Sequence, residues 1–288
     1  MNKAKGSLLA AMTIFGTVGI FVRYIPLPAA TVAFFRGVLG LILMLILMTL
    51  TGKKPDFSAI GKNLWLLLLS GGAMGLNWVF LFESYRHTTV AVATICYYLA
   101  PVFLVLVSPL LGEKLTGRKL VLSGIALVGM VFVSGVLDGG ISGGKGIAFA
   151  VGAAVLYTAV MFLNKKLGAI SAYDKTVMQL AAAAVVILPY CLLTGGFGMG
   201  QMAGRDYLLL AIVGIVHTGI AYWLYFGALG KLSSQSVALF SYIDPVIAII
   251  LSALWLGEMM HWQEILGAAL ILGSALISEL PGSSTGRQ

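Results

Sequence analysis

Long apolar stretches follow one another along almost the whole chain, and this pattern constrains the fold more than any single motif. A helix needs about 20 mostly apolar residues to cross the hydrocarbon core of a bilayer. Ten stretches come close to that length or exceed it. They are Ser7–Val22, Pro28–Leu50, Leu64–Phe82, Thr88–Leu111, Leu120–Leu137, Ile147–Asn164, Thr176–Leu193, Tyr207–Leu229, Ser233–Leu256 and Trp262–Ser278.

The composition excludes the soluble classes of protein. Charged residues make up 10% of the 288 residues and hydrophobic residues 60%, whereas a soluble chain carries about 25% charged residues. The mean hydropathy is +1.02, so a soluble enzyme, a nucleic-acid binder or a disordered chain could not hide this apolar surface. The stretches are continuous and do not alternate, which disfavours a β-barrel. We therefore predict an all-α polytopic membrane protein with ten transmembrane helices, embedded in the lipid bilayer.

The basic residues are distributed unevenly between the loops that join the stretches. With the N-terminus in the cytoplasm, 13 of the 18 lysines and arginines lie in cytoplasmic segments, and Arg36 lies inside a span. Only Arg23, Arg86, Lys145 and Arg205 lie outside. Cytoplasmic loops of membrane proteins carry such an excess, so we expect a multi-pass protein of the cell membrane with both termini cytoplasmic. The net charge of +8 then reflects topology and implies no nucleic-acid partner.

The two halves of the chain share landmarks. A shift of 144 residues aligns Pro101 with Pro245, and a shift of 145 residues aligns Gly112-Glu113 with Gly257-Glu258. A glycine-rich stretch lies at the midpoint. Each half holds five spans, and because five is odd the second half must enter the membrane inverted, as in many secondary transporters. The predicted units are a first repeat, 1–138, a linker, 139–146, and an inverted second repeat, 147–288.

The order of several motifs resembles the EamA-type transporters of the drug/metabolite transporter superfamily along the whole chain. This resemblance implies ten helices in two five-helix repeats and export of small metabolites, without fixing the substrate. The motifs are Phe15-Gly16 through Phe21-Val22-Arg23, Phe34-Phe35-Arg36-Gly37, Leu99-Ala100-Pro101 with Gly112-Glu113, Tyr242-Ile243-Asp244-Pro245 with Gly257-Glu258, and the closing segment Gly267–Gly273.

Asp244 is the strongest candidate for a substrate or coupling residue, because it is the only acid deep within a span. A buried aspartate costs about 2.5–3.5 kcal/mol on insertion scales, and the neighbouring Pro245 breaks helical hydrogen bonding. The repeat partner of Asp244 is Ala100, beside Pro101. We therefore predict helix breaks at both prolines and a role for Asp244 in binding a proton or a substrate amine; a structural pair with a neighbouring helix is the alternative.

Two further charged residues need an explanation. For Arg36 we favour a structural ion pair with a carboxylate over direct substrate contact. Glu83 lies at the outer end of the third span, where it is either a solvated interfacial carboxylate or part of the mouth of a cavity.

Aromatic and polar side chains around the same spans could line a cavity, although many aromatics also belong to interfacial belts. Residues 78, 82 and 85 share one helical face. A hydrogen-bonded packing role is the preferred interpretation of the histidine in this set. The remaining candidates for substrate contact are Trp78, Tyr98, Tyr222, Tyr242, His217 and Asn77.

Enzyme signatures are absent: the sequence has no His-Glu-x-x-His helix, Gly-x-Ser-x-Gly elbow or Walker loop. Its histidines and cysteines are too scattered for a metal site, and no cofactor is expected. The sequence favours a secondary transporter that exports amino acids or related metabolites. The alternatives are a cation, drug or amine exporter and a non-transporting membrane sensor or assembly partner. The spacings Gly71-x-x-x-Gly75 and Ala269-x-x-x-Gly273 predict close helix packing and allow a homodimer.

Overall fold

The computed structural model describes residues 3–133, 143–193, 197–229, 231–232 and 234–279. Within these residues all regular structure is helical. The α-helices are α1 (Lys3–Arg23), α2 (Ala29–Leu50), α3 (Phe57–His87), α4 (Val90–Tyr97), α5 (Ala100–Val107), α6 (Gly117–Val133), α7 (Gly144–Lys166), α8 (Ala172–Leu193), α9 (Gly204–Gly214), α10 (Ala221–Leu229), α11 (Ser234–Ser241), α12 (Ile243–Leu256) and α13 (Trp262–Glu279). Short helices are η1 (Ser108–Leu111), η3 (Met199–Gln201) and the π-helix η4 (Ile215–Ile220).

Eight helical segments of the described chain are long and apolar enough to cross a membrane, and this confirms a polytopic membrane protein. Trp262–Ser278 is a shorter apolar helix. The largest difference from the predicted spans is α3, which runs for 31 residues and extends past the predicted Leu64–Phe82 at both ends. Its start is fixed by Asp56, whose carboxylate accepts the Ala59 N–H at 3.0 Å and so satisfies one free amide of the first turn. Residues 134–142, which include the first half of the predicted linker 139–146, lie outside the described residues.

Two spans are interrupted near their prolines. The helix before Pro101 stops at Tyr97, and α5 begins at Ala100. In the second half, α11 ends at Ser241 and α12 begins at Ile243. Asp244 therefore lies in the first turn of a new helix.

Small residues allow the closest helix crossings. A Cβ on Gly71 would lie 2.6 Å from the Ala182 Cβ of α8, and one on Gly267 would lie 2.5 Å from the Gly129 carbonyl oxygen of α6. Gly273 has open space beside it. The predicted spacing at Gly71 therefore serves packing within this chain, whereas in α13 the close contact belongs to Gly267.

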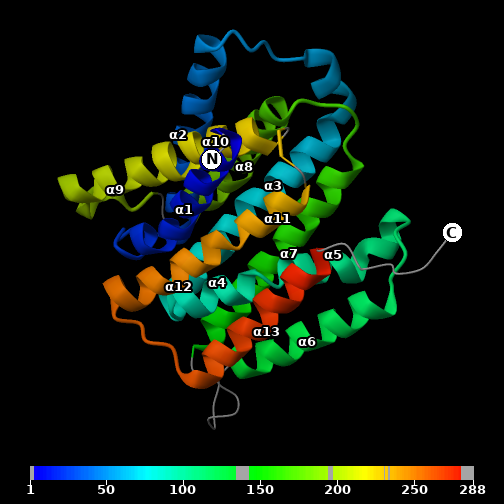
Figure 1. Cartoon of the computed structure of the whole chain (residues 1–288). Coiled ribbons are helices and arrows are strands. Elements are labelled where there is room, and N and C mark those ends of the chain that lie inside the picture. Colours follow the sequence, from blue (N-terminus) through cyan, green and yellow to red (C-terminus); the bar gives the residue numbers. More distant parts are fainter. Residues whose placement is uncertain (1–2, 134–142, 194–196, 230, 233, 280–288) are drawn as a thin grey trace, which may run out of the picture.

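The helices form one bundle in which helices of the two halves pack against each other (Figure 1). Helix α3 lies between α7 and α8, α12 packs on α1, and α6 lies beside α13. The hydrophobic core consists of buried residues from both halves, among them Phe82, Ile95, Leu180 and Ile271. This arrangement brings the interruption after α4 against the one before α12.

Candidate functional site

One tyrosine joins the two interrupted spans. Pro245 has no N–H to donate to the carbonyl of Ser241, four residues earlier. The hydroxyl of Tyr98, at the end of α4, lies 3.0 Å from that carbonyl oxygen and 3.1 Å from Oδ2 of Asp244. A side chain from the first interruption therefore bonds both to the backbone of the second interruption and to its acid.

Arg36 lies on the same side of the core, in α2. Its Nε donates to Oγ1 of Thr218 at 2.8 Å, and its guanidinium carbon lies 4.4 Å from the ring centre of Trp78 and 5.5 Å from that of Phe82. Only 5% of Arg36 is exposed. The negative faces of aromatic rings attract the buried cation.

The expected ion pair of Arg36 is not present in the described part of the chain. No carboxylate oxygen there lies within 4.0 Å of its guanidinium. Asp244 interacts with it electrostatically from beyond that distance, and the side chain of Tyr222 lies next to it. We call this set the central cluster; it consists of Arg36, Trp78, Phe82, Tyr98, Thr218, Tyr222 and Asp244.

The backbone around Arg36 is shaped to hold these partners. Thr218 lies in the π-helix η4, where its hydroxyl also bonds to the Val213 carbonyl at 3.2 Å. On α2, a Cβ at Gly40 would lie 2.5 Å from Cγ2 of Thr218. Only glycine therefore lets η4 approach closely enough for Thr218 to reach the guanidinium. Single π-turns within helices are frequent at functional sites.

The other predicted site residues lie at different places. His217 is 2% exposed and its Nε2 lies 2.8 Å from the Thr17 hydroxyl, as a packing histidine would. Asn77 donates to the Ala153 carbonyl at 2.6 Å and so ties α3 to α7. The ring of Tyr242 lies 6.0 Å from that of Tyr98, at the edge of the central cluster.

Glu83 is engaged with neighbours on its own helix. Its carboxylate lies 3.1 Å from His87 Nε2 and 3.9 Å from Arg86 Nε, and 29% of its side chain is exposed. The structure therefore places Glu83 in a partly exposed group of charges on α3, and its partners Arg86 and His87 also line the polar cavity described below. The interfacial role and the cavity-mouth role of Glu83 both stay predictions.

A largely buried carboxylate that was not among the predicted site residues lies at one end of the bundle. Glu258 accepts the backbone N–H of Val90 at 2.8 Å, accepts the hydroxyl of Ser252 and lies 3.5 Å from Nη2 of Arg23. Its side chain is 11% exposed. The Gly-Glu motif was the available signal in the sequence. Two of the partners of Glu258, Arg23 of α1 and Val90 of α4, are distant in the sequence, so the motif alone could not identify them.

The other Gly-Glu motif forms a shorter but more exposed ion pair at the opposite end. Oε1 of Glu113 accepts from Lys165 Nζ at 2.6 Å, and 39% of the Glu113 side chain is exposed. The hydrogen bond from Lys165 holds the pKa of the Glu113 carboxyl below its usual value. Gly146, in the first turn of α7, lies beside Thr88. Lys165 lies roughly 28 Å further along the same helix, at a rise of 1.5 Å per residue. We call the two regions the Glu258 end and the Glu113 end.

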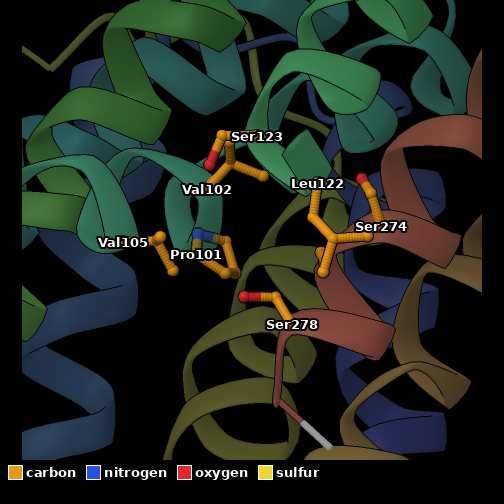
Figure 2. Close-up of a pocket in the computed structure, with 8 residues that line it drawn as sticks. Pro101, Val102, Val105, Leu122, Ser123, Ser274 and Ser278 are labelled. Carbon is orange, nitrogen blue, oxygen red and sulfur yellow. The ribbon is translucent and has the colours of Figure 1, made fainter. Parts of the chain in front are cut away.

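Two cavities lie outside the central cluster. A space of ≈ 20 Å³, enough for a single water molecule, lies between α5, α6 and α13 (Figure 2). A polar cavity of ≈ 400 Å³ opens at the Glu258 end. It is lined in part by Arg23, Arg86, His87, Thr88, Glu258 and Glu264. Within the described residues, no group of three or more His, Cys, Asp or Glu side chains could hold a metal ion.

Comparison with known proteins places this architecture in a family. The chain is 28% identical to an uncharacterized transporter, YxxF, of Bacillus subtilis, over 93% of this chain and 87% of the relative. It is 27% identical to an uncharacterized transporter of Vibrio cholerae, over 98% of this chain and 94% of the relative. A solved crystal structure shares the fold at a TM-score of 0.67 and 19% identity, over 96% of each chain. The model of the EamA-like transporter family matches residues 4–135 and 144–279. The chain therefore belongs to the EamA-like transporter family.

Proposed function

We propose that this protein is a secondary transporter that exports amino acids or related small metabolites across the cell membrane by alternating access. The observation that carries the proposal is the contact of Tyr98 with Asp244 and with the Ser241 carbonyl. It places a carboxylate at a junction where both halves of the chain have interrupted helices. Secondary transporters bind substrates and coupling ions at such discontinuous helices near the bilayer midplane.

The proposed architecture is ten spans in two inverted five-helix repeats, 1–138 and 147–288, joined by 139–146, with both termini cytoplasmic. Helix contacts support it. In this architecture the first repeat consists of α1, α2, α3, α4–α5 and α6, and the second repeat consists, in the same order, of α7, α8, α9–α10, α11–α12 and α13. The contact of α3 with α7 is then equivalent to the contact of α1 with α10. Likewise, the contact of α3 with α8 is equivalent to the contact of α2 with α9. Three further contacts join spans that are equivalent to each other: α2 with α8, the span α4–α5 with the span α11–α12 through α4 and α12, and α6 with α13.

The same correspondence relates the two ends of the bundle. Arg23 at the end of α1 is equivalent to Lys165 at the end of α7, and Glu258 is equivalent to Glu113, so the two ion pairs are equivalent as well. In alternating access, we expect the pair at the open end to separate while the other stays closed. With cytoplasmic termini, the Glu258 end faces outward, and its polar cavity is the proposed exit for the substrate.

A proton can be coupled to transport through Tyr98, because its hydroxyl has one hydrogen and two acceptors within reach. When Asp244 is ionised, Tyr98 donates to the carboxylate. When Asp244 is protonated, the acid donates to the Tyr98 oxygen and the Tyr98 hydrogen turns to the Ser241 carbonyl. Ionisation of Asp244 would thus change how the two interrupted spans are bonded. The other titratable groups in its field are Arg36 of α2, Tyr85 of α3 and Tyr97 of α4.

The test is flux into proteoliposomes at several pH values, with a panel of labelled amino acids. We expect Asp244→Asn to lower uptake strongly and to abolish its pH dependence. Asp206→Asn is the control, since Asp206 also lies in the first turn of a helix but bonds to the Ala203 N–H. Wild-type flux and an unchanged pH profile in Asp244→Asn would show that the acid is structural. A wild-type protein that moves no substrate would favour a sensor or assembly partner.

The alternative within transporters is an amine, cation or drug exporter. Asp244 beside the aromatic rings of Tyr98 and Tyr242 is an arrangement that also attracts organic cations. Uptake of amines without uptake of the matching amino acids would support this alternative. The homodimer stays a prediction that mass measurement in detergent can test.

A further inference from the structure

The proposed function does not explain why the central cluster holds a second buried charge. A buried cation is costly unless it is paired, yet no carboxylate oxygen of the described chain lies within 4.0 Å of Arg36. Its Nε is bound by Thr218 and its face by Trp78. A guanidinium has five N–H donors in a planar fork, so the Nη groups keep donor capacity beyond these contacts and the neighbouring Tyr222.

The surroundings of Arg36 hold it in one orientation. Thr218 fixes the Nε edge, and the rings of Trp78 and Phe82 stack on the cation. A planar fork held in this way matches the two oxygens of a carboxylate. Lysine could not offer that geometry, because its ammonium is a point charge on a flexible stem.

We infer that Arg36 binds the carboxylate of the substrate while Asp244 binds its ammonium group, so that the site selects zwitterionic amino acids. This inference rests on the proposed function and narrows it to one class of substrate. The two groups have opposite charge, come from different halves of the chain and belong to the same cluster, in which their charged atoms lie more than 4.0 Å apart. A zwitterion between them would pair each of the two protein charges with a group of opposite sign, and this pairing offsets the cost of desolvating the ammonium and the carboxylate of the substrate.

The experiment uses pairs of ligands that differ only in the carboxylate: leucine with isopentylamine and phenylalanine with phenethylamine. Binding and uptake of each are measured with the full-length protein in proteoliposomes. We expect Arg36→Gln to weaken amino-acid binding ~10- to 100-fold, the worth of a charge-assisted hydrogen bond, and to change amine binding little. The affinity of Arg36→Lys for the amino acid should lie between the affinities of the wild type and of Arg36→Gln. The control is Arg205→Gln, because the Arg205 guanidinium lies over Tyr24, at the start of α9.

The outcomes separate this inference from the proposed function. If wild type moves neither member of a pair, the proposed function fails. If it moves the amine alone, the protein remains a transporter and the zwitterion inference is overturned. If a folded Arg36→Gln protein loses affinity for the amino acid and for the amine by the same factor, Arg36 is structural. If Arg36→Gln does not fold, the ratio of amino-acid to amine binding in Arg36→Lys decides: a ratio equal to that of wild type refutes the inference.

Discussion

Replacing Glu258 by alanine tests whether the Glu258 end is held by backbone capping or by its ion pair. Val90 and Ser252 are both 0% exposed, and both donate to the same carboxylate. A buried donor that loses its acceptor costs about 1–3 kcal/mol. The Arg23 side chain is 37% exposed, and exposed ion pairs contribute only about 0–1 kcal/mol. The Ser252 hydroxyl can rotate toward another acceptor and so adds little. We therefore expect Glu258→Ala to destabilise the protein by about 1–4 kcal/mol.

The chain supplies its own control. Glu113 belongs to the other Gly-Glu motif, but its side chain is 39% exposed and that of Lys165 is 44% exposed, so Glu113→Ala should cost about 0–1 kcal/mol. Thermal unfolding in detergent measures both variants. At roughly 2–4 °C per kcal/mol for a chain of this order of size, Glu258→Ala should unfold several degrees below Glu113→Ala. Equal shifts, or no shift for Glu258→Ala, would refute the capping argument; Arg23→Gln should shift little in either case.

The Glu113 pair also predicts a dependence on pH. Because the pKa of this carboxyl is lowered in the folded protein, its stabilising effect is present above the ordinary value of 4.5 and is lost as the pH falls through the lowered pKa. We expect the small stability difference between wild type and Glu113→Ala to vanish in acid, as measured by unfolding across the pH range. A difference that grows on acidification would contradict this sign.

Three more predictions concern packing and topology. Gly267→Ala should destabilise the contact of α6 with α13 by about 1–3 kcal/mol through overpacking, whereas Gly273→Ala, which faces open space, should be neutral or slightly stabilising; thermal unfolding of the two variants compares them. Asn77→Ala removes a buried bond to α7 and should cost about 1 kcal/mol without changing substrate selectivity, which uptake assays check. A cysteine at Lys145 should be labelled by an impermeant reagent from outside intact cells and one at Lys53 should not; the reverse pattern would invert the proposed topology.

The sequence by itself determined the class of fold and the approximate position of the spans. Apolar length acts locally, because each helix must satisfy its own backbone hydrogen bonds inside a bilayer. Proline also acts locally through its missing N–H, so the neighbourhoods of Pro101 and Pro245 could be selected without any knowledge of the fold. The exact breaks, at Tyr98–Leu99 and at Tyr242, depend on the final packing and could not be located from the sequence.

The tertiary structure alone decided which partners each selected residue has. Arg36 was expected to pair with a carboxylate, but its hydrogen-bond partner is a hydroxyl 182 positions away, in a π-helix that hydropathy cannot predict. Glu258 was known only as half of a motif, and its contact with Val90 spans 168 positions. Such contacts depend on how helices cross, and the crossings depend on side-chain shape at sites such as Gly40 and Gly267. Hydropathy reports which segments enter the membrane, whereas the packing of surfaces between them sets which charges meet.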